Sequence, residues 1–150
     1  MEHSRKKLPV DIQSFEVMQT ENYLYVDKTQ HIYRMVTEGK FYFLSRPRRF
    51  GKSLLVSTLT CLFQGRKDLF AGLWIAEHSA WEWQAYPVVV LDFNEIPGSS
   101  PTELKDALGF WLQELAQRSG LQLNAPGVQL QFRELILALY KQTGKPVVIL

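Results

Sequence analysis

The residues that could do chemistry in this sequence are concentrated in one short segment, Arg46-Pro47-Arg48-Arg49-Phe50-Gly51-Lys52-Ser53. Gly51 leaves the backbone open to a closely approaching phosphate, because glycine has no side chain to obstruct it. Lys52 is expected to reach the outer phosphates of a nucleotide, and the Ser53 hydroxyl is expected to coordinate Mg²⁺. The segment therefore predicts a phosphate-binding loop of the P-loop type.

This segment departs from the complete P-loop pattern at one position. The pattern has glycine five positions before Gly51, where this chain has Arg46. The loop arginines have two interpretations: they pair with Asp or Glu elsewhere in the fold, or they donate to phosphates in place of backbone groups. The plainest alternative to a nucleotide site is a strand-to-helix turn that contains a glycine and surface charges.

Hydrolysis of a nucleotide needs acids as well as a phosphate loop. An aspartate at the end of a neighbouring strand holds Mg²⁺, and a second acid positions the attacking water. Asp92 follows the apolar run 88–91 and has Glu95 three residues further on, so Asp92 is a candidate metal ligand. The competing interpretation is that Asp92 caps the strand or a turn.

The other residues that could carry chemistry have structural explanations. Asp27 can cap a helix with Gln30 at the third position, and a contact near the nucleotide is its alternative role. Cys61 is expected to be an inert core thiol, and a single cysteine excludes an internal disulfide. Trp81 and Trp83 are expected in a core or an interface, with base stacking as the alternative. The histidines are too scattered to predict a metal site: His3, His31 and His78.

The elements that must position the loop alternate between apolar strands and amphipathic helices. Buried strands are expected at 41–44, 87–91 and 146–150, after a short strand at 23–26. Helices are expected from Asp27 or Thr29 to Gly39, over 52–63, from 101 onward behind Ser100 with Glu103 and Pro101, and from about 128 to Gly144. No regular structure is assigned to 65–86. The pattern predicts an α/β fold, a P-loop NTPase-type parallel sheet flanked by helices.

Composition and charge limit the class of protein. The 150 residues are 46% hydrophobic and 21% charged, which is too apolar for a disordered chain. The longest apolar run, 135–140, is far short of the ~20 residues that a membrane span needs. No secretory signal follows the basic start, so a cytoplasmic protein without a membrane partner is expected. Residues 1–75 carry twelve Lys and Arg against seven acids, whereas 76–150 carry five against eight. An anionic partner should therefore meet the first half.

Four separated motifs occur in the order found in one known family: 23–29, 42–55, 69–75 and 86–93. The sequence from about Leu8 to Leu150 resembles the bacterial AAA-ATPase-like family, in which an arginine in place of the first loop glycine is typical. The resemblance implies a P-loop ATPase domain that uses ATP and Mg²⁺. In longer relatives it implies a following PD-(D/E)XK nuclease-like domain.

The resemblance also bears on the catalytic acids. In that family they directly follow the strand that 147–150 matches, so we expect a single domain, 1–150, that is cut short at its third core strand. Its expected parts are a lead-in (1–20), a capped helix, strand, loop and helix (21–64), and the remaining strands and helices (65–150). The main hypothesis is nucleotide binding with weak or no hydrolysis. The alternatives are a non-enzymatic module that binds nucleic-acid phosphates and an inactive product. The expected protein partner is a second copy of the chain or a missing C-terminal domain.

Overall fold

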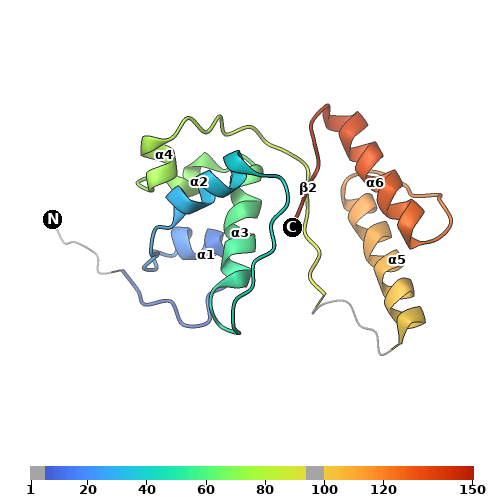
Figure 1. Cartoon of the computed structure of the whole chain (residues 1–150), viewed down its shortest axis with the longest axis horizontal. Helices are drawn as coiled ribbons and strands as arrows, with labels where there is room; N and C mark the ends of the chain where they lie inside the picture. Colours follow the sequence, from blue (N-terminus) through green and yellow to red (C-terminus); the bar gives the residue numbers. More distant parts are fainter. Residues whose placement is uncertain (1–5, 94–99) are drawn as a thin grey trace. The chain divides into compact units, whose positions relative to one another are not determined.

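The computed structural model describes residues 6–93 and 100–150 of the chain. These residues form two compact units. One consists of the residues up to 85 together with Leu150, and the other consists of residues 86–149. Figure 1 colours the helices of the first unit from blue to green and those of the second unit from yellow-orange to red. The phosphate-loop segment belongs to the first unit.

The first unit contains five helical segments around an apolar core. They are α1 (Phe15–Thr20), α2 (Thr29–Glu38), α3 (Lys52–Phe63), the 3₁₀ segment η1 (Lys67–Phe70) and α4 (Trp74–His78). The buried side chains of this core are Phe15, Ile32, Leu59, Cys61, Leu62, Leu69, Phe70 and Ile75. Helix α1 packs on α3 and η1, whereas α2 packs on α4.

The predicted lead-in contains a helix that anchors it to this core. Ser14 is the N-cap of α1, and its hydroxyl accepts a hydrogen bond from the Val17 amide at 3.3 Å. Phe15 is completely buried and stacks obliquely on Phe70, with 4.7 Å between the ring centroids. The Phe15 amide donates to the Ser57 hydroxyl on α3 at 2.9 Å. The last residues of the lead-in are therefore part of the packed unit.

Helix α3 has the predicted bounds, Lys52–Phe63. Leu59 and Leu62 are buried on its inner side, as the helical spacing predicts. Because α3 is fixed along its second half by this burial, its first turn has a defined position at the end of the loop.

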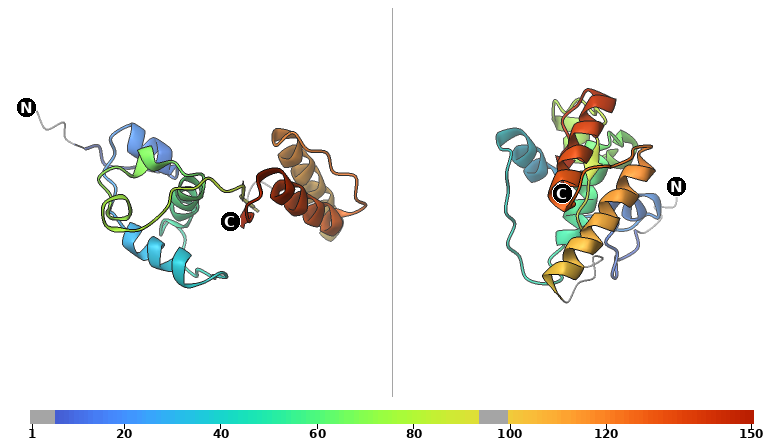
Figure 2. Two further views of the ribbon diagram at one scale, coloured as in Figure 1. Left: turned by 90° about the horizontal axis from the view of Figure 1, so that it is seen from above. Right: turned by 90° about the vertical axis from the view of Figure 1, so that its right-hand side faces the viewer.

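The segment before the loop corrects one prediction. The run 41–44 was expected to form a buried parallel strand, but it has no strand structure, and Phe41 and Phe43 are 95% and 94% exposed. Apolar composition favours a strand only where a neighbouring strand can accept its hydrogen bonds, and no such pairing exists among the described residues. The views in Figures 1 and 2 show this stretch as a long open arc from the end of α2 to the start of α3.

The short strand expected at 23–26 is reduced to one bridge. Tyr23 pairs in parallel with Lys7, and the Leu24 amide donates to the Lys7 carbonyl at 2.8 Å.

The second unit contains the parallel strand pair and two long helices. Strand β1 (Val88–Val89) pairs with β2 (Val148–Ile149), with Val88 opposite Val148 and Val89 opposite Ile149. Between them in the chain are α5 (Pro101–Arg118) and α6 (Val128–Thr143), which lie side by side in Figures 1 and 2. The core consists of Val89, Leu112, Ala116, Leu123, Leu135 and Leu139.

The ends of these helices follow the sequence signals. The Ser100 hydroxyl accepts a hydrogen bond from the Glu103 amide at 3.2 Å, and Pro101 is the first helical residue of α5. Gly144 ends α6 in the left-handed conformation, with φ of 67°. The predicted caps are confirmed. The strands expected at 87–91 and 146–150 form, but each spans only two residues, and the predicted burial holds only for Val89, whereas Ile149 is 42% exposed.

Candidate functional site: an anion-binding loop

Gly51 connects the loop to α3 in a conformation that favours glycine. Its φ is 74° and ψ is 24°, which is left-handed, and it occupies the N-cap position of α3. Arg49, two residues earlier, also has a positive φ of 67°. The two left-handed residues bend the chain sharply, so the loop turns back onto the first turn of the helix.

The Lys52 side chain closes the loop. Its ammonium group donates to the Arg46 carbonyl at 2.7 Å and to the Pro47 carbonyl at 2.9 Å. An ammonium group has three donors, so two hold the loop and one can serve an anion. The positive charge of Lys52 is thus fixed beside the start of α3, although the residue itself is exposed.

The start of α3 adds a second source of positive potential. No side chain caps this end, and the N–H groups of a helix's first turn have no partners within the helix. These amides carry the positive end of the helix dipole, which attracts anions. Ser53 lies in the same turn and is exposed. The loop, Lys52, the open amides and the Ser53 hydroxyl therefore lie together.

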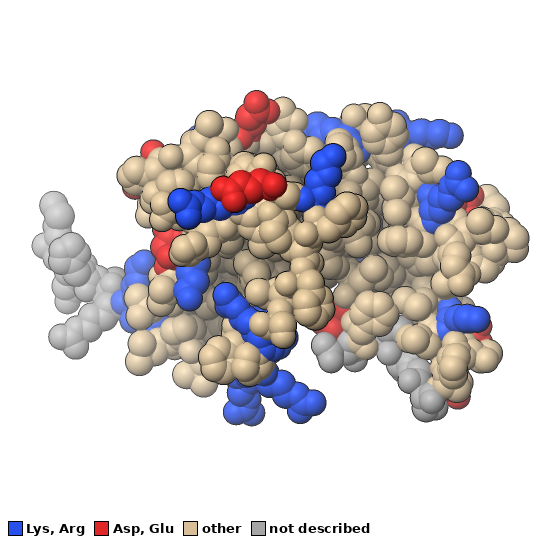
Figure 3. All heavy atoms as spheres, in the orientation of Figure 1, with Lys and Arg blue, Asp and Glu red and all other residues tan. Residues whose placement is uncertain are grey.

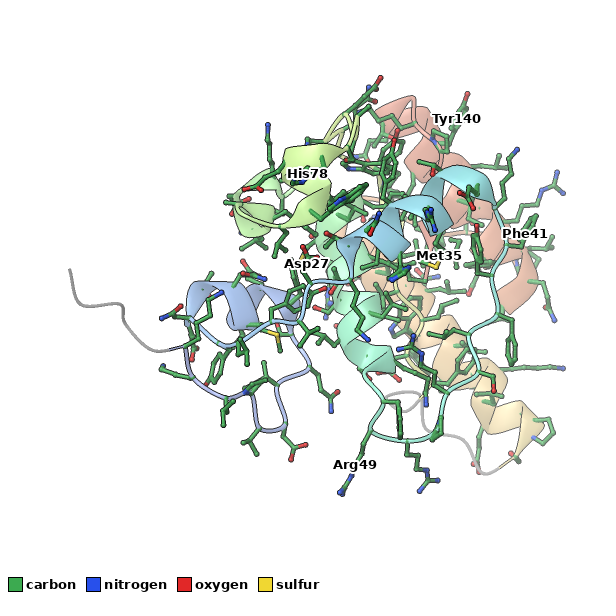
Figure 4. All side chains as sticks on the ribbon, turned by 60° about the vertical axis from the view of Figure 1, so that its left-hand side comes forward. Asp27, Met35, Phe41, Arg49, His78 and Tyr140 are labelled. Carbon is green, nitrogen blue, oxygen red and sulfur yellow. The ribbon has the colours of Figure 1, made fainter. Side chains whose placement is uncertain are left out.

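The loop arginines face solvent. Arg46 donates from Nη1 to the Phe50 carbonyl in a long contact of 3.4 Å. Figure 4 shows Arg49 at the outer bend of the loop, pointing away from the ribbon. Among the described residues, the ion pairs belong to Arg66 and Arg118 and not to the loop. The prediction that these arginines pair with acids thus finds no support in the described part of the chain.

The charge of the loop is visible on the molecular surface. In Figure 3, Lys and Arg side chains project from the lower edge, where Figure 1 draws the loop and the first turn of α3. The basic residues of this segment, all exposed, are Arg46, Arg48, Arg49 and Lys52. A bound anion would relieve their mutual repulsion.

A cavity of about 720 Å³ opens beside the loop within the first unit. The loop contributes Arg46, Phe50 and Gly51 to its wall, and α3 contributes residues that follow the loop. Other parts of the wall come from residues 24–26 and from α2, including His31 and Met35. Sequence reasoning missed these lining residues of α2, because their spacing indicates only a helix with an apolar face.

Asp92 belongs to the second unit. Asp92 is exposed shortly after β1, and Glu95 lies outside the described residues. In the described ranges, no group of three or more His, Cys, Asp or Glu side chains is arranged to hold a metal ion. The metal role of Asp92 stays a prediction.

Asp27 joins two helices. Its Oδ1 accepts hydrogen bonds from the Thr29 amide at 2.8 Å and the Thr29 hydroxyl at 2.7 Å, and its Oδ2 accepts from the Trp74 amide at 2.7 Å. Desolvation raises the pKa of the Asp27 carboxyl, but these three hydrogen bonds outweigh it, so the pKa lies below its ordinary value. Asp27 therefore binds the amides of the first residues of α2 and α4, but the N-cap of α2 is Lys28 and not Asp27 or Thr29 as predicted.

The remaining aromatic and thiol groups are structural. Trp81 packs edge-on against Phe63 at 5.7 Å between centroids, and Trp83 packs on Phe70 at 5.1 Å. Cys61 is buried, and burial raises the pKa of its thiol. The tryptophans and the cysteine thus have the core roles predicted. His78 stacks on Trp74, and His3 lies outside the described residues.

The loop and the open end of α3 define a site that can bind an anion. The chain belongs to the family described as predicted AAA-ATPase, whose model matches residues 9–150. It is 38% identical over 149 residues to a protein of Azotobacter chroococcum mcd 1 described as "Uncharacterized protein in vnfD 5'region". The match covers 98% of this chain and 28% of that relative, so the chain spans just over a quarter of the relative's length.

No solved structure matches the chain. In the part of the chain that the structure describes, no helix combines the length and apolar character needed to cross a bilayer.

Proposed function

We propose that the loop 46–53 binds the phosphates of a nucleoside triphosphate, ATP, together with Mg²⁺. The observation that carries the proposal is the position of Lys52, whose ammonium is held by two loop carbonyls beside the uncapped start of α3. The negative oxygens of a triphosphate would accept hydrogen bonds from the loop's unpaired cations and from the open amides of α3. Membership of a family described as predicted AAA-ATPase supports the same choice of ligand.

The residues present fit a magnesium ion bound with the nucleotide. Ser53 lies exposed in the first turn of α3, beside the amides that face the phosphates. Its hydroxyl would be the protein's ligand to Mg²⁺, which keeps several waters and takes its other ligands from phosphates. When bound, Mg²⁺ neutralises charge on the outer phosphates.

The proposal extends to the fold, a P-loop type α/β domain. Its support is the parallel pairing of β1 and β2, because parallel neighbours require a crossover connection and α5 and α6 provide one here. For longer proteins that contain a segment of this kind, we further propose that the domain hydrolyses ATP. For the same proteins we propose that a nuclease-like domain follows it.

Isothermal titration calorimetry with ATP and Mg²⁺ tests the assignment. We expect Lys52→Ala to weaken ATP binding at least tenfold, because it removes the charge fixed beside the helix start. Lys67→Ala is the matched control: it removes the same charge from an exposed position on η1 and should leave affinity unchanged. Equal ATP affinity for the Lys52→Ala and wild-type proteins would refute the proposal.

A second candidate function is binding of nucleic-acid phosphates by the same loop. Its specific support is the exposure of three arginines that form no ion pair within the described ranges. Guanidinium groups bind phosphate diesters as well as triphosphates. The dependence of binding on salt separates the two functions.

A further inference from the structure

The outer face of α6, opposite the core of the second unit, carries an open apolar groove of about 470 Å³. Leu130 and Leu137 lie two turns apart along this groove, and these residues are 49% and 47% exposed. By contrast, Leu135 and Leu139 of the same helix are buried in the core. Exposed apolar side chains that gather in one patch are typical of an interaction surface. This α6 groove is therefore a candidate for such a surface.

Two cations lie along the α6 groove. Arg133 and Lys141 line it together with the leucines, and both are exposed. Glu134 also lines the groove, but its Oε2 accepts hydrogen bonds from the Asn124 and Ala125 amides, both at 2.9 Å. Within the described ranges, the ion pairs include neither Arg133 nor Lys141. The groove thus fits a partner that presents an apolar side chain between acids.

The outer face of α5 carries the complementary pattern. Four exposed residues, three or four positions apart, lie along one face of this helix: Glu103, Asp106, Phe110 and Glu114. Phe110 is 78% exposed within this α5 stripe. Glu114 pairs with Arg118 on the same helix, whereas Asp106 belongs to none of the ion pairs in the described part of the chain. An aromatic side chain flanked by acids therefore projects from α5.

We propose that a second copy of the chain covers the α6 groove, with Phe110 of its α5 stripe between Leu130 and Leu137. The acids that flank Phe110 then face Arg133 and Lys141. Because every copy has both surfaces, each α5 can lie on the α6 of the other copy, and the contact forms twice in a two-fold dimer. Burial of Phe110 favours association, and the charges select which helices meet. This inference concerns the second unit and does not depend on the function proposed for the loop.

Sedimentation velocity over a range of protein concentrations tests for the dimer. Small interfaces are weak and transient, so we expect a monomer–dimer equilibrium at micromolar concentrations. Phe110→Ala should weaken dimerisation about tenfold, because a central aromatic anchor carries much of the binding energy of an interface. Phe41→Ala is the matched control: it removes an exposed phenylalanine from the first unit and should leave the dimer unchanged. A wild-type chain that stays monomeric at every concentration would overturn the proposal.

Two double variants test the pairing of the charges. One reverses the α6 groove with Arg133→Glu and Lys141→Glu. The other reverses the α5 stripe with Asp106→Lys and Glu114→Lys. Each variant alone should be monomeric where the wild type is dimeric, because like charges then face each other.

An equal mixture of the two double variants should dimerise as the wild type does. In the mixed dimer one contact joins the two reversed surfaces and the other joins the two native ones, so acids face cations in both. Recovery in the mixture would also show that neither variant had lost its fold. Wild-type dimerisation by either variant alone would overturn the proposed contact, and so would a mixture that stays monomeric.

Discussion

At Lys52 and Gly51 the chain combines a positive charge held by loop carbonyls with a left-handed turn at the start of α3. The Lys52 ammonium is held by loop carbonyls rather than by a carboxylate, so its charge is available to an anion. Gly51 is left-handed at the point where the helix amides open to solvent. Under the proposed function, both features would serve a ligand that carries several negative charges.

Gly51→Ala tests the backbone part of this site. An added Cβ would meet nothing within 4 Å, so the substitution introduces left-handed strain without a clash. We expect a loss of about 1 kcal/mol in the free energy of unfolding, measured by urea denaturation. We also expect weaker ATP binding, because the methyl group obstructs the approach of phosphate.

Gly120→Ala provides the matched control. Gly120 has a φ of +70° and the same open surroundings, but it lies after α5, outside the loop. Its substitution should reduce stability by a similar amount and leave ATP binding unchanged. If the two variants bind ATP equally well, the loop backbone does not approach the phosphates.

Among the elements, α2 links the cavity to the rest of its unit, and Asp27 fixes its start. The Thr29 hydroxyl, which donates to Asp27, accepts a hydrogen bond from the Ile75 amide at 3.1 Å. Thr29 is completely buried, so this network connects α2 to α4 inside the core. The orientation of the cavity wall therefore depends on an ionised Asp27.

The lowered pKa of Asp27 predicts a pH dependence. A carboxyl whose pKa is lower in the folded state contributes stability that is present above its unfolded value, near 3.8, and lost as pH falls through the folded value. Asp27→Asn should reduce stability at pH 7 by about 1 kcal/mol, the effect of a partly exposed cap. The difference from wild type should shrink below pH 4.

Thermal unfolding of both proteins between pH 7 and pH 2.5 measures this effect. Glu38→Gln, at the exposed end of α2, is the control and should match the wild type at pH 7. A constant difference between Asp27→Asn and wild type over the whole range would contradict the ionised cap.

The same elements show where sequence reasoning succeeds. Helix α3 has a run of apolar residues at helical spacing, and α5 has a strong N-cap in Ser100, so both could be bounded from local signals. Helix α1 has only six residues, too few for a clear period. The run 41–44 was placed wrongly, because strand formation depends on partners distant in the sequence.

The candidate site also has one part that could be predicted from the sequence and one part that could not. The loop residues could be predicted from a contiguous motif, since Gly51, Lys52 and Ser53 follow one another in the chain. The cavity could not be predicted, because residues 24–26, α2 and α3 meet only in the folded unit. Local chemistry is readable from sequence, whereas the shape of a cavity depends on packing between separate elements.

At the scale of the whole molecule, the small net charge of +2 conceals a basic first half that holds the loop. Raising salt from 50 to 200 mM should weaken ATP binding at most about tenfold, because a single nucleotide presents few phosphates. A nucleic acid that contacts six or more phosphates would lose about 10³-fold or more over the same range. Fluorescence anisotropy of a labelled oligonucleotide measures its affinity at each salt concentration. Repeating the titration with ATP shows whether the nucleotide competes for the same loop. An oligonucleotide bound with the steep salt dependence and not displaced by ATP would favour the nucleic-acid function.

A crystal structure of the chain with Mg²⁺ and a non-hydrolysable ATP analogue tests the central claim most directly. We predict the outer phosphates at the first turn of α3, with the Lys52 ammonium and the Ser53 hydroxyl on opposite sides of them. The Lys52 contacts with the Arg46 and Pro47 carbonyls should lengthen as the ammonium turns to phosphate. An analogue bound elsewhere, with those contacts unchanged at 2.7 and 2.9 Å, would contradict the account.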